Sequence, residues 1–233
     1  KLIYNLTMKD ELQNEDLFNG FIEFTSYSTL LDPDDPMDFN TRFSGKIYLR
    51  DENGYKIEIG AIYGSIIEIT KVIDYDKTHV LYDLLDLDQE IHNYMSQIWD
   101  FKNEEYFEEI NPHHEAIRDA LILDKLYIYP EFNGNGYGLA AIQRTIEHFR
   151  LNINAIVIFQ AHPLQLEQDR KKHNIDKFNE QMDLTLFESD KEKATKSLMN
   201  YYSKANFKRI KDTTYMYKLE IGNINSLTNG KKS

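Results

Sequence analysis

Three glycines alternate at positions 134, 136 and 138, between an apolar run and an amphipathic segment. Glycine has no side chain to obstruct a ligand that approaches the backbone closely. The first amide groups of a helix have no partner within the helix, and the helix dipole favours negative charge there. The stretch Asn133–Gly138 therefore predicts a place that holds phosphate.

Asp124 is a candidate for moving a proton. It is the one acid within the apolar run that precedes the glycines. Burial in a strand would raise its pKa and suit it to accept a proton. By the two-residue alternation of a strand, Asp124 is expected to face the same way as Ile122, Leu126 and Ile128.

Two other side chains compete with Asp124 for this role. Glu68 is expected in the comparable position of an earlier strand, and His162, just after a second buried strand, has a suitable intrinsic pKa. A chain of water molecules is a further alternative, and a structural ion pair would explain either acid equally well. The pair His113-His114 lacks a third ligand nearby and predicts a polar loop.

The hydrophobic pattern identifies the elements that must position these residues. The near-continuous apolar run Leu121–Ile128 predicts a strand covered on both faces, and Pro130 ends it. Ala155–Phe159 predicts a second buried strand. The helix between them packs one face on the sheet, because its apolar residues recur at helical spacing: Leu139, Ile142, Ile146 and Phe149.

Upstream, alternating residues predict a strand at Gly20–Tyr27. A hairpin is expected from Phe43–Arg50 and Tyr55–Thr70, because Asn53-Gly54 favours a tight turn, with a bulge or bend near Gly60 and Gly64. Asp74–Asp88 is expected to be irregular. A helix is predicted over Asp88–Trp99, capped by Asp88.

Downstream, Lys191–Ala205 predicts a helix, and Phe207–Ile210 with Thr214–Glu220 a closing hairpin. We expect a single domain over residues 1–220, with early strands at 20–70, a lid helix at 88–99, a core at 117–160, an inserted loop at 160–190 and a late helix and hairpin at 191–220. Residues 221–233 are expected to form a flexible tail. The order of elements suits an α/β (α+β) fold with a mixed, mostly antiparallel sheet flanked by helices.

Composition narrows the function classes. The 233 residues carry a net charge of −12, which argues against a nucleic-acid or membrane surface and is compatible with a cationic ligand, or simply with solubility. The sequence has no cysteine, so disulfides and a cysteine nucleophile are excluded. No apolar run is long enough to span a bilayer and no signal-peptide pattern is present, so we expect a cytoplasmic protein.

Two common phosphate-binding motifs fit the glycines poorly. A nucleotide-binding P-loop ends in Gly-Lys-Ser/Thr, which is absent here. A dinucleotide fingerprint has the spacing G-x-G-x-x-G and an acidic residue about twenty positions on. Here the spacing is G-x-G-x-G, and the second strand is followed by Gln160-Ala161-His162-Pro163.

The stretch Leu126–Gly138, LYIYPEFNGNGYG, resembles the acyl-CoA-binding motif of the GNAT superfamily of N-acyltransferases. That motif has a strand ending in an aliphatic residue, then proline, then Gln/Arg-x-x-Gly-x-Gly/Ala. Ile128 and Pro130 take the first two places, and Asn133 stands where Gln or Arg is usual. A later segment, Tyr202–Phe207, is similar to the family's Tyr-x-x-x-Gly-Phe, with Asn206 in place of glycine, a residue that tolerates left-handed backbone angles.

The resemblance covers roughly residues 117–219 and implies acetyl-CoA as the acyl donor, with no metal. Two central strands would separate to admit it, and a backbone amide near Ile128 would stabilise the oxyanion. Tyr202 would protonate the leaving thiolate, with Asp124 and Glu68 as the principal candidates for the base. The expected donor-binding residues are Leu126, Tyr127, Ile128, Asn133, Gly134, Asn135, Gly136, Tyr137 and Gly138.

The resemblance implies transfer of an acetyl group to a primary amine in a ternary complex. The acceptor could be a small molecule or a peptide, and the sequence does not choose among a polyamine, a lysine side chain, a protein N-terminus and an aminosugar. The rival interpretation is a non-catalytic module of this fold that binds CoA or a protein partner. The chain is also compatible with a homodimer.

Overall fold

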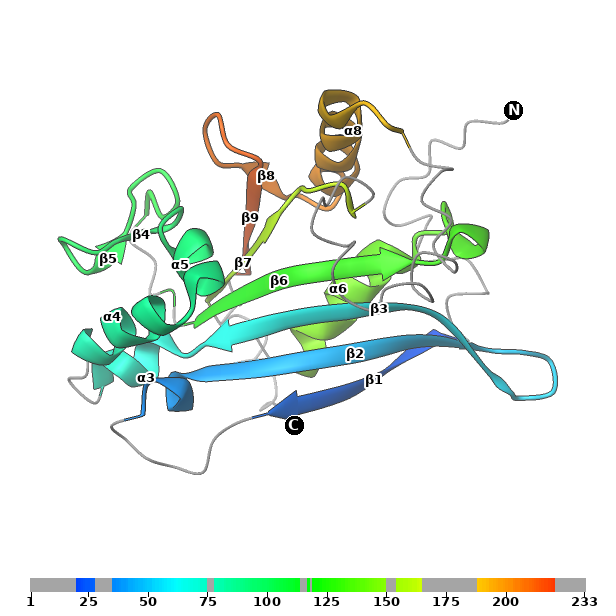
Figure 1. Ribbon diagram of the computed structural model, residues 1–233, viewed down its shortest axis with the longest axis horizontal. Helices are drawn as coiled ribbons and strands as arrows, with labels where there is room; N and C mark the ends of the chain where they lie inside the picture. Colours follow the sequence, from blue (N-terminus) through cyan, green and yellow to red (C-terminus); the bar gives the residue numbers. More distant parts are fainter. Residues whose placement is uncertain are drawn as a thin grey trace, which may run out of the picture.

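The computed structural model describes residues 20–27, 35–74, 78–113, 117, 119–149, 154–164 and 188–220 (Figure 1). Two sequence predictions lie outside these residues: most of the insertion at 160–190, and the tail at 221–233. The described part has an α+β architecture built on a mostly antiparallel sheet of seven strands. This confirms the predicted mixed, mostly antiparallel sheet flanked by helices.

The sheet has the order β1-β2-β3-β6-β7-β9-β8, and all neighbours are antiparallel except β6 and β7. A separate two-stranded ribbon joins β4 to β5. The strands are β1 (Gly20–Tyr27), β2 (Asn40–Arg50), β3 (Lys56–Ile67), β4 (Trp99–Asp100), β5 (Glu105–Tyr106), β6 (Asp119–Ile128), β7 (Ala155–Gln160), β8 (Lys208–Arg209) and β9 (Tyr215–Glu220).

Helices cover both faces of the sheet (Figure 1). One face packs on the 3-10 turn η1 (Pro36–Phe39) and on helices that follow β3, and the other packs on helices from the second half of the chain. The first group is α3 (Ile69–Asp74), α4 (Thr78–Leu87) and α5 (Gln89–Met95); the second is α6 (Tyr137–His148), preceded by the 3-10 turn η2 (Pro130–Phe132), and α8 (Lys191–Ser203).

Strand β6 divides its side chains between the two layers. Ile122 packs in the cluster that contains α4 and α5, whereas Leu121 and Leu123 pack in the cluster that contains α6. Each of the three is at most 4% exposed. Burial on both faces explains why this segment is a near-continuous apolar run rather than an alternating one.

A β-bulge at Asp124 interrupts this alternation. Tyr63 of β3 lies opposite Lys125 and the next residue, Gly64, lies opposite Leu123, so Asp124 has no opposite residue in β3. A bulge adds one residue to one strand, so every side chain beyond it lies on the opposite face from the one that simple alternation predicts. The glycine at 64 is needed here, because a Cβ at this position would lie 2.2 Å from the carbonyl oxygen of Ile122.

The bulge corrects one prediction. Asp124 was expected to share a face with both Ile122 and Leu126 by simple alternation. Instead Leu126 and Ile128 pack toward Tyr137 and Ala141 of α6. Asp124 contacts Glu90 of α5 on the opposite face of the sheet, which is also the face on which Ile122 packs. The two-residue alternation fails because two residues, instead of one, lie between Leu123 and Leu126, which face the same side.

The two central strands β6 and β7 separate before either ends. Their parallel pairing begins at Asp119–Ala155 and stops at Leu123–Phe159, yet β6 continues to Ile128. From this point β7 pairs only with β9, through Gln160 and Tyr215, within the described residues. A gap therefore opens beside Asp124–Ile128.

Element boundaries differ from the prediction in three places. The strand expected over Tyr55–Thr70 ends at Ile67, and α3 begins at Ile69. The segment Asp74–Asp88 was expected to be irregular but contains α4, whose residues Leu81, Leu84 and Leu85 are buried. The helix predicted over Asp88–Trp99 ends at Met95, and Trp99 lies in β4. None of the helices in the described part of the chain is long and apolar enough to cross a membrane.

Candidate active site between the separated strands

A cavity of about 520 Å³ occupies the gap between β6 and β7. Its wall combines β6 from Leu123 to Ile128, the glycine turn with the start of α6, the end of β7, and one side of α8. Segments far apart in the chain thus meet at the point where the sheet separates. The size and the mixed polar and apolar lining are those of a ligand site.

The backbone of β6 offers hydrogen-bonding groups to this cavity. The N–H of Tyr129 donates to the carbonyl oxygen of Ile59 at 2.8 Å, which makes these two a hydrogen-bonded pair across β3 and β6. Such pairs alternate along antiparallel strands. Leu126 and Ile128 therefore direct their N–H and C=O groups away from β3 into the gap, where no described strand pairs with them.

The glycine turn forms the end of the cavity at α6. Gly134 and Gly136 have φ values of +85° and +80°, which other residues rarely adopt. Gly136 is the N-cap of α6, and the first intrahelical bond runs from the Ala140 N–H to the Gly136 carbonyl oxygen. The amides of Gly138 and Leu139 precede that bond and have no partner within the helix. This arrangement can bind an anionic group without a metal or a basic side chain.

Two tyrosines of α8 line the opposite wall. The ring of Tyr202 lies 4.3 Å from that of Phe159 and 6.3 Å from that of Phe207, so it is held by aromatic packing. Burial, and secondarily the neighbouring Tyr201, raise the pKa of Tyr202, which keeps its hydroxyl protonated at neutral pH. Tyr201 lines the same cavity, with its hydroxyl 3.4 Å from the position of a Cβ at Gly138.

A pair of carboxyl groups lies at the bulge. The Glu90 side chain of α5 is hydrogen-bonded to Asp124, which itself lines the cavity. That hydrogen bond, followed by desolvation and by the charges of Asp124 and Asp88, raises the pKa of Glu90 to about 7, against a smaller opposing effect of Lys125. Two close carboxylates do not both ionise easily, so Glu90 loses its proton only near neutral pH. Both residues remain exposed to solvent.

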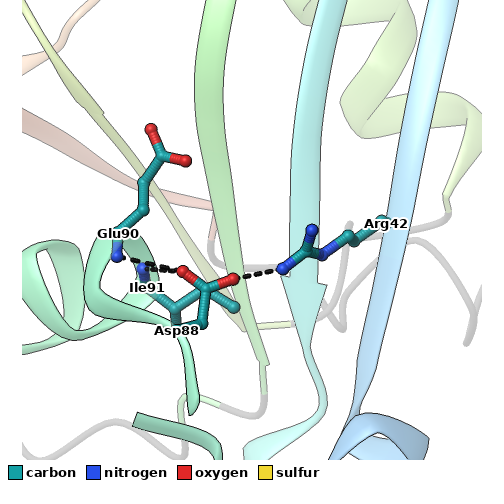
Figure 2. A network of polar contacts seen from close by, with 4 residues as sticks. All are labelled: Arg42, Asp88, Glu90 and Ile91. Atoms are coloured by element: carbon teal, nitrogen blue, oxygen red, sulfur yellow. Dashed lines mark hydrogen bonds and ion pairs between the residues drawn. The ribbon is translucent and has the colours of Figure 1, made fainter. Parts of the chain in front are cut away.

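The first turn of α5 fixes the position of Glu90. The Asp88 carboxylate caps this helix by accepting hydrogen bonds from the N–H groups of Glu90 at 2.9 Å and Ile91 at 3.1 Å. Its other oxygen pairs with the guanidinium of Arg42 in β2. Figure 2 shows the Glu90 side chain extending away from the Arg42–Asp88 pair. The predicted cap at Asp88 is confirmed, and it anchors the carboxyl that contacts Asp124.

Tyr94 follows Glu90 by one helical turn and lies on the same side of α5. Its hydroxyl lies near the backbone of Gln160, at the end of β7, and its ring packs edge-on against Tyr215 at 5.4 Å. Burial and the nearby carboxyls of Asp124 and Glu90 raise the pKa of Tyr94. The helix α5 therefore touches both separated strands, through Glu90 on β6 and Tyr94 on β7.

The structure brings most of the expected residues together but not Glu68. Tyr202, Asp124, His162 and the predicted donor-binding residues except Asn135 line the cavity. Glu68 lies beyond the end of β3, roughly 13 Å along the strand from the bulge at about 3.3 Å per residue. It pairs with Lys71 at 3.0 Å. Its distance from the cavity makes the structural ion pair the better explanation for Glu68.

Two other polar residues have surface roles. Arg144 is exposed on α6 and pairs with Glu147 at 2.8 Å. His113 lies exposed in a loop, and no group of three potential metal ligands occurs among the residues that the structure describes. Asn206, by contrast, adopts the left-handed φ of +65° expected of a residue that replaces glycine.

Sequence reasoning missed Glu90. The helix over Asp88–Trp99 was predicted, but only its apolar side was used. The available signal was the spacing of Glu90 and Tyr94, which places an acid and a phenol on one helix face. Nothing in the sequence showed that this face meets Asp124, because the contact joins residues 34 positions apart through a bulge.

Comparison with known proteins gave no relative: no family model, no curated protein and no solved structure matches this chain.

Proposed function

We propose that this protein is a GNAT-type N-acyltransferase that transfers an acetyl group from acetyl-CoA to a primary amine. The observation that carries the proposal is the separation of β6 from β7 after Leu123–Phe159, with a cavity of about 520 Å³ in the gap. The family resemblance requires such a gap, and the sequence motif lies in its wall. The fold is accordingly interpreted as GNAT-like.

The residues around the cavity fit a thioester of this kind. The backbone groups of Leu126 and Ile128 can pair with the amides of a pantetheine arm as an added strand would. The glycine turn and the amides of Gly138 and Leu139 can hold a pyrophosphate. Tyr202 lines the cavity, and in this proposal its hydroxyl is the proton donor for the thiolate sulfur.

The reaction needs a neutral amine, stabilisation of the oxyanion and a proton for the leaving sulfur. The amine nitrogen attacks the thioester carbonyl carbon, which forms the C–N bond, and the C–S bond then breaks. A backbone N–H near Ile128 stabilises the charge that develops on the carbonyl oxygen. Tyr202 gives its proton to the thiolate. The nitrogen loses a proton to solvent, and Tyr202 regains one from solvent. The products are an N-acetylated amine and free CoA.

The rival proposal is a non-catalytic module that binds CoA through the same cavity. Exposure of the Glu90–Asp124 pair to solvent favours the enzyme, because a binding module needs no accessible proton acceptor at the thioester end of its cavity.

Two measurements test the proposal. Acetyl-CoA binding is measured by isothermal titration calorimetry, and thiol release is followed with a panel of primary amines. The protein has no cysteine, so every thiol detected comes from CoA. We expect saturable binding and amine-dependent thiol release. Binding without release for any amine would favour the module, and absence of binding would refute both.

A further inference from the structure

The side of the sheet that carries α5 has a row of tyrosines beyond the carboxyl pair. Because Leu126 and Ile128 pack on α6, Tyr127 and Tyr129 project from the opposite face, as does Tyr63 of β3. The rings of Tyr63 and Tyr127 lie 6.4 Å apart, and those of Tyr127 and Tyr129 lie 5.9 Å apart. The row leads from the bulge along the end of β6.

An acidic residue, Glu58, lies at the far end of this row. The Tyr129 hydroxyl donates to the Glu58 carboxylate at 3.2 Å, and Lys46 pairs with the same carboxylate at 2.9 Å. The pairing of β3 with β2 skips Ile59, so Glu58 and Tyr63 share one face and lie opposite Tyr48 and Ser44, which are four residues apart. The row is therefore roughly 13 Å long at about 3.3 Å per residue. It has a carboxyl pair at one end, aromatic faces in the middle and a carboxylate at the other end.

We propose, on the basis of the function proposed above, that the acceptor is a linear polyamine bound along this row. Its reacting nitrogen lies at Glu90 and Asp124, and a second positive nitrogen lies over the tyrosines toward Glu58. Aromatic faces attract ammonium groups and also pack against the methylene segments between them. The acceptor thus enters from the α5 side, and the donor lies between β6 and the helices α6 and α8.

In this arrangement Glu90 is the catalytic base. An amine that arrives as an ammonium ion transfers one proton to the ionised carboxylate of Glu90, and the neutral nitrogen then attacks the thioester. The carboxyl pair returns this proton to solvent after the turnover. No oxidant, reductant or further reactant is needed.

Among the residues that the structure describes, Lys125, Arg42 and Lys46 bring positive charge toward the row. Lys125 follows the bulge, Arg42 is paired with Asp88, and Lys46 is paired with Glu58. The side chains of Lys46 and Glu58 are 60% and 32% exposed, and an exposed pair of this kind is weak. A substrate ammonium can therefore replace Lys46 at Glu58 at little cost.

The first experiment compares amines of matched length. Thiol release from acetyl-CoA is measured with spermidine, spermine and 1,4-diaminobutane, and with n-alkyl monoamines, a lysine peptide and an aminosugar. We expect kcat/KM for spermidine or spermine to exceed that of the monoamine of equal length by about tenfold or more. Equal values, or a preference for the peptide or the aminosugar, would overturn the assignment of the acceptor.

The second experiment uses variants. Glu58→Gln should raise KM for spermine about three- to tenfold while leaving KM for a monoamine unchanged. Glu23→Gln is the matched control, since Glu23 is also an exposed strand carboxylate paired with a lysine, in β1. Glu90→Gln should lower kcat about 10²-fold with every amine, because proton removal is lost.

The outcomes separate this inference from the proposed function. Binding of acetyl-CoA by Glu90→Gln serves as the test that the variant is folded. Thiol release that is insensitive to Glu90→Gln and Glu58→Gln would refute the inference while the acyltransferase stands. Absence of thiol release from the wild type with every amine would refute the function itself.

Discussion

Leu123 lies opposite Phe159 in the last pair that joins β6 to β7. Both side chains are buried in the same cluster as α6, so the sheet separates within the hydrophobic core and not at its rim. The cavity that follows is walled by elements already fixed by that core. A ligand there meets backbone groups held in place before it binds, which reduces the cost of ordering them.

Replacement of Gly134 by valine is expected to abolish acetyl-CoA binding. A Cβ at Gly134 meets no protein atom within 4 Å, so it would enter open space, which the proposed function assigns to the pyrophosphate. The control is Gly54→Val, because Gly54 has a similar φ of +82° and also no atom within 4 Å, but lies in the β2–β3 turn. Both variants should lose about 1–2 kcal/mol of stability. Only Gly134→Val should lose binding by calorimetry, and retained binding would move the pyrophosphate elsewhere.

Substitution of Tyr202 by phenylalanine should lower turnover about 10²-fold through loss of the proton donor. Affinity for acetyl-CoA should stay nearly unchanged, because the ring and its packing on Phe159 are preserved. Tyr201→Phe is the matched control, since Tyr201 is adjacent and lines the same cavity. Steady-state thiol release measures both variants. If Tyr201→Phe shows the loss and Tyr202→Phe does not, the proton donor is Tyr201.

The Glu90–Asp124 contact predicts a particular dependence of stability on pH. The pKa of Glu90 rises from 4.5 to about 7 on folding, so between these values the folded state binds more protons than the unfolded state. The free energy of unfolding should therefore decrease as pH rises from about 4.5 to about 7, through this group. The groups that act on Glu90 are Asp124, Asp88 and Lys125.

Thermal unfolding of Glu90→Gln across pH 4–8 tests this dependence. The variant should lose the decrease that the wild type shows over this window, because its side chain does not ionise. Glu147→Gln removes an exposed carboxylate paired with Arg144 on α6 and should leave the slope as in the wild type. The carboxyl contact would be contradicted if the Tm changed between pH 4.5 and pH 7 by the same amount in the wild type and in Glu90→Gln.

Asp88 should act on turnover through α5. Asp88→Ala removes the cap and should cost about 1 kcal/mol of stability. It should also lower kcat, because the N–H of Glu90 is bound to the Asp88 carboxylate and the first turn positions the base. Asp88→Asn keeps a capping oxygen and should restore most of the stability and of kcat. Recovery of stability without recovery of kcat would show that turnover depends on the charge of Asp88 near Glu90 and not on the helix cap.

The sequence predicts the secondary structure around the cavity well and the acceptor side poorly. The apolar run, Pro130 and the alternating glycines are local signals, and they correctly predict β6, the turn and α6. The position of Asp124 depends on a bulge set by pairing with Tyr63 and Gly64, which no local pattern reveals. Helix α4 was not predicted because the acidic residues of its exposed side outweighed the helical spacing of the buried residues Leu81, Leu84 and Leu85.

The bulge makes β6 tolerant of changes in identity and in length at one position. Asp124→Asn should fold, because the residue is exposed and has no opposite residue in β3. Deletion of Asp124 would place Leu123 and Leu126 two positions apart, as in a regular strand, so both halves of β6 would keep their present layers and only the bulge would be lost. Deletion of a single residue within 120–123 or 126–128 would instead turn one part of the strand to the wrong layer. Gene variants that lose the Asp124 codon should therefore still yield soluble protein, whereas one-codon deletions in those two segments should not. The acceptor chemistry can thus change by substitution without any change in the frame that holds the donor.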